Sequence, residues 1–207
     1  MPHQIPHRAN LLVLKELGAR AVLATTVVGA TDPALPLGRP VLFDDLYFPE
    51  NRLPGGEPCT VFVEPGEEGR GHLIAAEPFS PRLRRRAGLA AAELGFEPLY
   101  GGVYAHANGP RFETKAEIRA LRAAEVSAVS QTSGPEAVLA GELEMPYCLV
   151  GFPVNYATGV AEVEPKEELN RLHTLAARTL PGIILRTVEM LKEDDLAYDY
   201  GYVYRFE

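Results

Sequence analysis

The chain has 207 residues, of which 46 % are apolar, and a formal net charge of −8. This length suffices for one domain with a sizeable core, and the acidic balance argues against nucleic acid as the main partner. The two cysteines form no CxxC pair, the five histidines show no metal-ligand spacing, and no secretory signal or long apolar stretch is recognisable. We therefore expect a cytoplasmic protein with reduced thiols, no metal, no other cofactor and no membrane contact.

The first third of the chain predicts a helix followed by a buried strand. Helical periodicity runs over Leu11–Leu17 and stops at Gly18. Ala21–Thr26 then has the apolar character of a strand in a parallel sheet. The polar end of this strand, residues 25–29, falls where open α/β sheets place their ligands. Its threonine hydroxyls could hold an oxyanion, or the threonines could simply be good strand formers.

The segment that follows predicts several short elements. A basic run from Arg82 to Arg86 is interpreted as the solvated face of a helix that Ser80 caps. The expected strands are Val41–Tyr47, Cys59–Val63 and His72–Ala76, and the expected helix is Arg82–Leu94.

The stretch from Gly101 to Glu136 organises the prediction. Gly102–Ala107 is expected as a strand, and Asn108-Gly109-Pro110 as the turn that ends it. Thr114 and Glu117 have the spacing of a capping box, so a helix should begin at Lys115. A buried strand at Val126–Ser130 and a second capping box, Ser133 to Glu136, complete the stretch. Two helix N-termini, which attract anions, therefore open from polar loops.

One carboxylate in the first of these loops has two interpretations. Glu113 directly follows Phe112, and in most proteins such a loop acid is simply solvated. The alternative is a ligand-facing acceptor beside an aromatic wall, which suits a flat heterocycle with N–H donors.

The last third predicts a helix, a strand, a long helix and an aromatic tail. Ala137–Leu143 is expected as helix, and Tyr147–Val154 as a buried strand that leads to Asn155. Asn155 is either a turn asparagine that bonds its own backbone or a ligand contact, since its amide carries both a donor and an acceptor. A long helix begins at Pro165 and should kink or break at Pro181-Gly182. Alternate aromatic residues at 198–206 suggest an extended edge, for which packing on a neighbouring subunit is one hypothesis.

Two segments together resemble the purine nucleoside and methylthioadenosine phosphorylase family. GPRFETKAEIRALR is similar to that family's GPxFET turn and helix, and SAVSQTSGPEAVLA is similar to its strand ending in Met-Ser/Thr-Thr-x-Pro-Glu. The segments His7–Asn10 and Glu77–Phe79 resemble the methylthioadenosine branch. The resemblance covers nearly the whole chain, and it implies one nucleoside phosphorylase-like domain over residues 1–207. The implied fold is α/β, a three-layer αβα arrangement with a mixed central sheet, assembled as a homotrimer or homohexamer.

The resemblance also assigns roles to individual residues. It implies phosphorolysis of a purine nucleoside with phosphate as co-substrate, with Glu113 and Asn155 as the catalytic pair. Branches that act on 6-oxopurines carry Glu and Asn at these positions, whereas the methylthioadenosine branch carries Ser and Asp. A 6-oxopurine nucleoside, with or without a 5′-methylthio group, is therefore the expected substrate. The remaining implied contacts are Thr26 and Thr132 to phosphate, and Val27, Val28, Gly29, Tyr104, Phe112 and Gln131 to base and sugar.

The sequence departs from the family before its first helix. Family members carry a Gly-Ser/Thr phosphate loop, a first strand and an Arg-His pair there, and nothing in this sequence corresponds to them. Three interpretations remain open at this point. The protein is a phosphorylase whose phosphate site other residues or a neighbouring subunit complete, or a nucleosidase of the same fold. The third is a non-catalytic purine-binding paralogue, or a reading frame that starts late.

Overall fold

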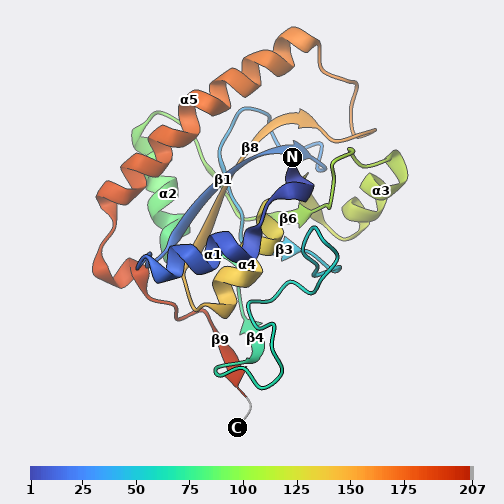
Figure 1. Ribbon diagram of the computed structural model, residues 1–207. Coiled ribbons are helices and arrows are strands. Elements are labelled where there is room, and N and C mark those ends of the chain that lie inside the picture. Colours follow the sequence, from blue (N-terminus) through green and yellow to red (C-terminus); the bar gives the residue numbers. More distant parts are fainter. Residues whose placement is uncertain (206–207) are drawn as a thin grey trace.

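A mixed seven-stranded sheet forms the centre of the computed structural model, which describes residues 1–205 (Figure 1). Strands β1 and β8 run parallel to each other, and β7 and β2 pair antiparallel to them on either side. β6 and β3 continue the sheet in parallel beyond β7, and β5 continues it beyond β2. In sheet order the strands are β3 (Asp45–Tyr47), β6 (Val103–His106), β7 (Val126–Ser130), β1 (Val22–Ala30), β8 (Tyr147–Tyr156), β2 (Val41–Leu42) and β5 (Leu99–Tyr100).

Helices cover both faces of the sheet, which confirms the expected αβα layers (Figure 1). The apolar run of β8 shows why, because its alternate side chains enter two different cores. Tyr147 and Leu149 pack in the core under α1 and α4, whereas Cys148 and Val150 pack in the core under α2 and α5. The helices are α1 (His7–Glu16), α2 (Pro81–Glu93), α3 (Lys115–Ala123), α4 (Ser133–Glu142) and α5 (Lys166–Met190), with short 3₁₀ turns at Pro2–Gln4 and Glu193–Leu196. None of the helices described is long and apolar enough to cross a membrane.

One predicted strand is absent and another is divided. Cys59–Val63 pairs with no strand among residues 1–205. Instead the N–H of Val61 and the hydroxyl of Thr60 donate to the Glu142 carboxylate, at 2.6 and 2.9 Å. Cys59 and Val61 are buried, so the alternation of the sequence reflects packing beneath α4 rather than a sheet. The predicted strand Val41–Tyr47 is divided at Phe43 and Asp44 into β2 and β3.

The two predicted capping boxes have different outcomes. The box at Thr114 and Glu117 is confirmed in both of its hydrogen bonds. The second box is wrong, because α4 begins one residue earlier than the pattern requires and has Thr132 at its N-cap. The Glu136 carboxylate accepts from the Tyr147 hydroxyl at 2.8 Å rather than from the helix backbone.

The expected kink or break at Pro181 is not a break, since α5 continues through it as one helix of 25 residues. A proline inside a helix costs about 3 kcal/mol. The apolar face on both sides of it, with Leu172, Leu180 and Ile183 buried, offsets that cost by packing against the sheet layer.

Part of the basic run on α2 is paired rather than solvated, whereas Arg85 is exposed. Arg84 lies against Glu77 and Asp44, and Arg86 donates to Asp195 at 2.7 Å, with the two arginine side chains only 13 % and 15 % exposed. These pairs fasten α2 to distant parts of the chain.

The aromatic tail forms a strand of its own. β9 (Gly201–Arg205) pairs antiparallel with β4 (Gly71–Ala75) in a two-stranded sheet beside α4. Tyr202 and Tyr204 remain about half exposed, and Phe206 lies outside the described residues. Packing of this edge on a neighbouring subunit stays a prediction.

Candidate active site

A cavity of about 670 Å³ opens beside the central strands β1, β7 and β8. Eight of the ten residues that the sequence singled out line it, although they come from four separate segments. They are Val27, Val28, Gly29, Phe112, Glu113, Gln131, Thr132 and Asn155. The fold therefore gathers the end of β8, the turn before α3 and the start of α4 around one space.

A local irregularity between two strands presents Asn155 to this cavity. Gly29 is the register partner of Asn155, and the β1–β8 register shifts between Val28 and Gly29. A Cβ atom on Gly29 would lie 3.4 Å from Asn155 Nδ2, so this glycine packs directly beside the amide. Nδ2 donates to the Tyr156 carbonyl at 2.8 Å, which fixes the amide plane. One N–H and the carbonyl oxygen remain for a ligand.

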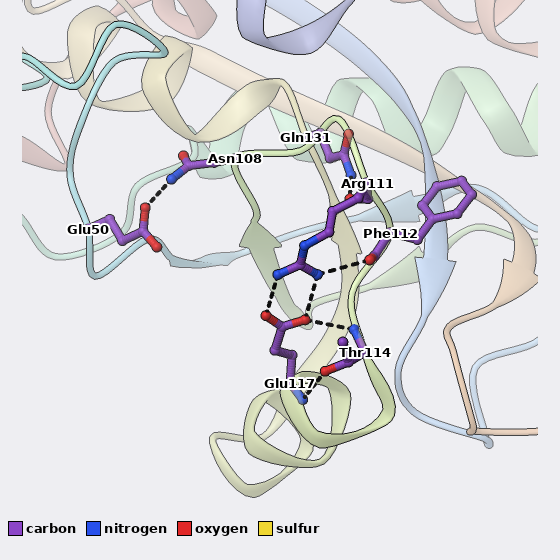
Figure 2. Close-up of polar contacts among 7 residues, drawn as sticks. All are labelled: Glu50, Asn108, Arg111, Phe112, Thr114, Glu117 and Gln131. Atoms are coloured by element: carbon purple, nitrogen blue, oxygen red, sulfur yellow. Dashed lines mark hydrogen bonds and ion pairs between the residues drawn. The ribbon is translucent and has the colours of Figure 1, made fainter.

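The acid and its aromatic neighbour enter the cavity from the turn between β6 and α3. Figure 2 shows Phe112 projecting away from the polar contacts that hold this turn. The Phe112 side chain is 81 % exposed, so a whole ring face is free to cover a planar ligand. Glu113 follows directly and lines the same cavity as Asn155.

Hydroxyl groups and a helix N-terminus occupy another part of the lining. Thr132 is the N-cap of α4, and Ser130 ends β7. The N-terminal N–H groups of a helix favour an anion. Ser130, which the sequence reasoning missed, lies with its Oγ 3.1 Å from Thr26 Oγ1.

Thr26 itself lies behind the lining. Its hydroxyl donates to the Val27 carbonyl at 3.0 Å and contacts Ser130, and the residue is 8 % exposed. Ser130 rather than Thr26 therefore lines the cavity, and the expected contact of Thr26 with phosphate stays a prediction.

Tyr104 is buried in the core, so its expected position as a wall of the cavity is wrong. It has no exposed surface, and its ring centroid lies 5.5 Å from that of Phe43. Its hydroxyl accepts from the Ser133 N–H at 3.2 Å, and burial raises the pKa of this phenol. Tyr104 therefore supports the start of α4 from beneath.

Two histidines, the buried His7 and the partly buried His106, lie close to the same helix end. His7 is 1 % exposed, with Nδ1 3.5 Å from Glu136 Oε1. Burial, and secondarily the charge of His7, lowers the pKa of His106 to about 3, so His106 is neutral near pH 7. Its ring packs edge-on against Phe48, with centroids 4.7 Å apart. Both imidazoles are therefore part of the support beneath α4.

The far wall of the cavity comes from residues that the sequence reasoning did not select. Leu169 and His173 lie one turn apart on α5, a spacing that could have indicated a common face. The loop between β8 and α5 completes the wall, and its Val163 side chain is 94 % exposed. The other additions are Pro2, Lys115, Val129, Tyr156 to Gly159, Ala161, Glu162 and Glu164.

No group of three or more metal-ligating side chains occurs within residues 1–205. The lining instead combines two side-chain amides, an exposed phenyl ring, hydroxyls and three carboxylates, with one lysine and one histidine. Such a set can recognise a polar planar ligand and an anion through hydrogen bonds.

Residues 2–189 match the sequence profile of the phosphorylase superfamily. The chain belongs to this family. It is 41 % identical over 201 residues to a probable 6-oxopurine nucleoside phosphorylase of Thermococcus kodakarensis, covering 93 % of this chain and 73 % of the relative. It is 39 % identical to the 6-oxopurine nucleoside phosphorylase of Pyrococcus furiosus, covering 77 % and 60 % of the two chains.

Another relative of this superfamily member is a probable S-methyl-5'-thioinosine phosphorylase of Pseudomonas syringae, 36 % identical with 86 % and 74 % covered. Among solved structures, a methylthioadenosine phosphorylase from Schistosoma mansoni in complex with tubercidin superposes with a TM-score of 0.80. That match covers 91 % of this chain and 71 % of the other at 23 % identity, and it establishes the common fold.

Proposed function

We propose that this phosphorylase superfamily member catalyses phosphorolysis of purine nucleosides, with 6-oxopurine nucleosides as its substrates. The similar enzymes named above support the reaction type. The observation that carries the choice of base is the convergence of Glu113 and Asn155, 42 positions apart in the chain, on one cavity beside Phe112.

The two side chains complement the edge of a 6-oxopurine. Such a base offers an N–H donor at N1 and an acceptor at O6, and a protein needs an acceptor and a donor in return. The Glu113 carboxylate is an acceptor only, and the Asn155 amide has a free N–H to donate to O6 or N7. A 6-aminopurine would leave its bare N1 facing the carboxylate, and a buried mismatch of this kind costs several powers of ten in kcat/KM.

The reaction requires no covalent intermediate on the protein. A phosphate oxygen attacks C1′ of the sugar, the bond from C1′ to N9 breaks, and its electron pair moves into the purine ring. Asn155 stabilises the negative charge of the leaving base by a hydrogen bond at N7, and Glu113 holds N1. Thr132, Ser130 and the N-terminus of α4 bind the attacking phosphate. Catalysis thus consists of positioning and electrostatic stabilisation.

Hydrolysis by the same fold is the competing reaction, and Asn155 argues against it. A nucleosidase of this fold uses an acidic residue at the leaving-group position, whereas an amide cannot donate a proton completely. Cleavage of inosine, methylthioinosine, adenosine and methylthioadenosine, each with and without phosphate, tests the proposal. We expect phosphate-dependent cleavage of the two 6-oxopurine nucleosides. Equal rates without phosphate would reject phosphorolysis, and preference for the amino bases would reject the specificity.

We further propose a cytoplasmic homotrimer or homohexamer. The exposed Phe112 and Val163 at the cavity support assembly, because a neighbouring subunit would cover apolar surface there. Both cysteines are free and buried, which suits a reducing compartment. Light scattering on the purified protein measures the assembly, and a monomeric mass with full activity would exclude it.

A further inference from the structure

The turn that carries Phe112 and Glu113 is held by two side chains outside the cavity lining. Arg111 and Glu117 form a two-point ion pair, with Nη1–Oε2 at 2.9 Å and Nη2–Oε1 at 2.7 Å (Figure 2). Nη1 also donates to the Phe112 carbonyl at 3.1 Å. Because Phe112 and Glu113 lie between the two partners in sequence, the pair encloses them.

The same carboxylate also holds the backbone on the other side of Glu113. Glu117 Oε2 accepts from the Thr114 N–H at 2.7 Å, and Thr114 Oγ1 accepts from the Glu117 N–H at 3.3 Å. The carbonyl before Glu113 and the N–H after it are therefore both bonded to one guanidinium–carboxylate unit. This arrangement restricts both peptide groups that flank the acid.

Two more contacts connect the turn to distant segments. Gln131 Nε2 donates to the Arg111 carbonyl at 2.8 Å, from the end of β7. Asn108 Nδ2 donates to Glu50, which belongs to the loop after β3 (Figure 2). The turn is thus attached to the sheet, to α3 and to an outer loop. Gln131 thus supports the turn as well as lining the cavity, and its expected contact with the sugar stays a prediction.

The ion pair keeps its charge at every pH at which the enzyme would be assayed. Hydrogen bonds from Arg111 and Thr114 lower the pKa of Glu117 to about 2. The two side chains are 66 % and 45 % exposed, and exposed pairs contribute little to overall stability. Thr114 can cap α3 without Arg111, so stability of the helix does not account for the arginine.

We propose that Arg111 and Glu117 are positioning residues that set the base specificity of the cavity. Their two-point ion pair holds the Glu113 carboxylate and the Phe112 ring in the geometry that distinguishes a 6-oxopurine from a 6-aminopurine. The inference rests on the proposed function. Displacement of a substrate-positioning group by about 1 Å costs on the order of 100-fold in rate.

The test compares Arg111→Met, Arg111→Lys and Glu117→Gln with a matched control, Arg205→Met. Arg205 forms a similarly exposed two-point pair with Glu144 beside β9, away from the cavity. For each protein, kcat and KM are measured with inosine and adenosine, and dissociation constants with hypoxanthine and adenine. Thermal unfolding verifies that every variant is folded.

We expect Arg111→Met and Glu117→Gln to reduce the inosine-to-adenosine ratio of kcat/KM by about 10- to 100-fold, mainly through KM. Arg111→Lys should recover little, because an ammonium group cannot form the planar two-point contact. Arg205→Met should leave the ratio unchanged. In a Glu113→Gln background, Arg111→Met should cause no further loss of the ratio, since it acts through Glu113.

Three results would overturn the inference. The first is an unchanged inosine-to-adenosine ratio of kcat/KM in Arg111→Met. The second is a wild-type ratio in Arg111→Lys, because charge alone would then matter, and the third is an additive loss of the ratio in the Glu113→Gln background. A wild-type protein that binds neither base would instead reject the proposed function, and with it the positioning role of Arg111 and Glu117. If the wild-type discrimination between the bases survives in Arg111→Met, only that positioning role is rejected.

Discussion

Replacing Asn155 by aspartate is the most informative single change in the cavity. The Asn155 Nδ2 atom donates to the Tyr156 carbonyl at 2.8 Å and has one further N–H for the base. An aspartate oxygen at the same place has no proton. It would face the Tyr156 carbonyl without a hydrogen bond, and it would repel O6 and N7 of a 6-oxopurine. The leaving base, which gains negative charge, would then meet a carboxylate instead of a donor.

The expected loss in kcat/KM for inosine follows from the removal of one preorganised donor and the addition of one repulsion. Loss of a donor that stabilises a developing anion costs about 10²- to 10³-fold in kcat, or about 3–4 kcal/mol. We therefore expect Asn155→Asp to lower kcat/KM for inosine at least 10³-fold. Adenosine should lose less, because its 6-amino group can donate to the new carboxylate. Asn155→Ala is the control, with a loss near 10²-fold and no gain for adenosine.

The assay measures by chromatography the hypoxanthine or adenine that each folded variant releases at saturating phosphate. Retention of inosine cleavage within about threefold of wild type would refute the reasoning, because the amide would then have no contact with the leaving base. Equal losses for the two nucleosides in Asn155→Asp would show that the amide supports the cavity without reading the base.

Three further changes probe the support of the site. Tyr104→Phe leaves the buried Ser133 N–H without its 3.2 Å acceptor. The free energy of unfolding should therefore fall by about 1–3 kcal/mol and Tm by several degrees. An unchanged Tm would contradict the contact. Thr132→Val should raise KM for phosphate about tenfold and leave KM for inosine unchanged; a rise for inosine alone would place the anion elsewhere. His106 has a folded pKa lowered to about 3, so its stabilising contribution is complete above the unfolded value of about 6.5 and is lost as pH falls toward 3. His106→Gln should therefore reduce the fall in Tm between pH 6.5 and 4, and an identical fall in both proteins would exclude His106 as its cause.

Local sequence signals predicted the elements on either side of the cavity. The Thr114–Glu117 spacing predicted the start of α3, and Ser80 predicted the start of α2, because a cap depends on residues within one turn. Long apolar runs predicted β1 and β8 for a similar reason, although both strands continue beyond the predicted ends. The second capping box failed because α4 begins one residue early, and the Tyr147 hydroxyl on β8 bonds Glu136 instead.

The strand pattern predicted which side chains share a face of a strand, but not whether that face points toward the core or the cavity. Tyr104 and His106 share a side of β6, but only the position of β6 between β3 and β7 turns that side toward the core. Thr26 and Ser130 were likewise recognisable as polar strand residues. Which of the two reaches the cavity depends on how β1 and β7 pair.

By itself, the sequence determined the family, the layered fold and the two side chains that can complement a purine, because each of these depends on short motifs and apolar patterning. Tertiary structure alone decided that Glu113 and Asn155 share a cavity, that Tyr104 lies beneath it and that Gln131 holds the turn. Those contacts join residues far apart in the chain. Their geometry is set by strand register and helix packing, which no local pattern specifies.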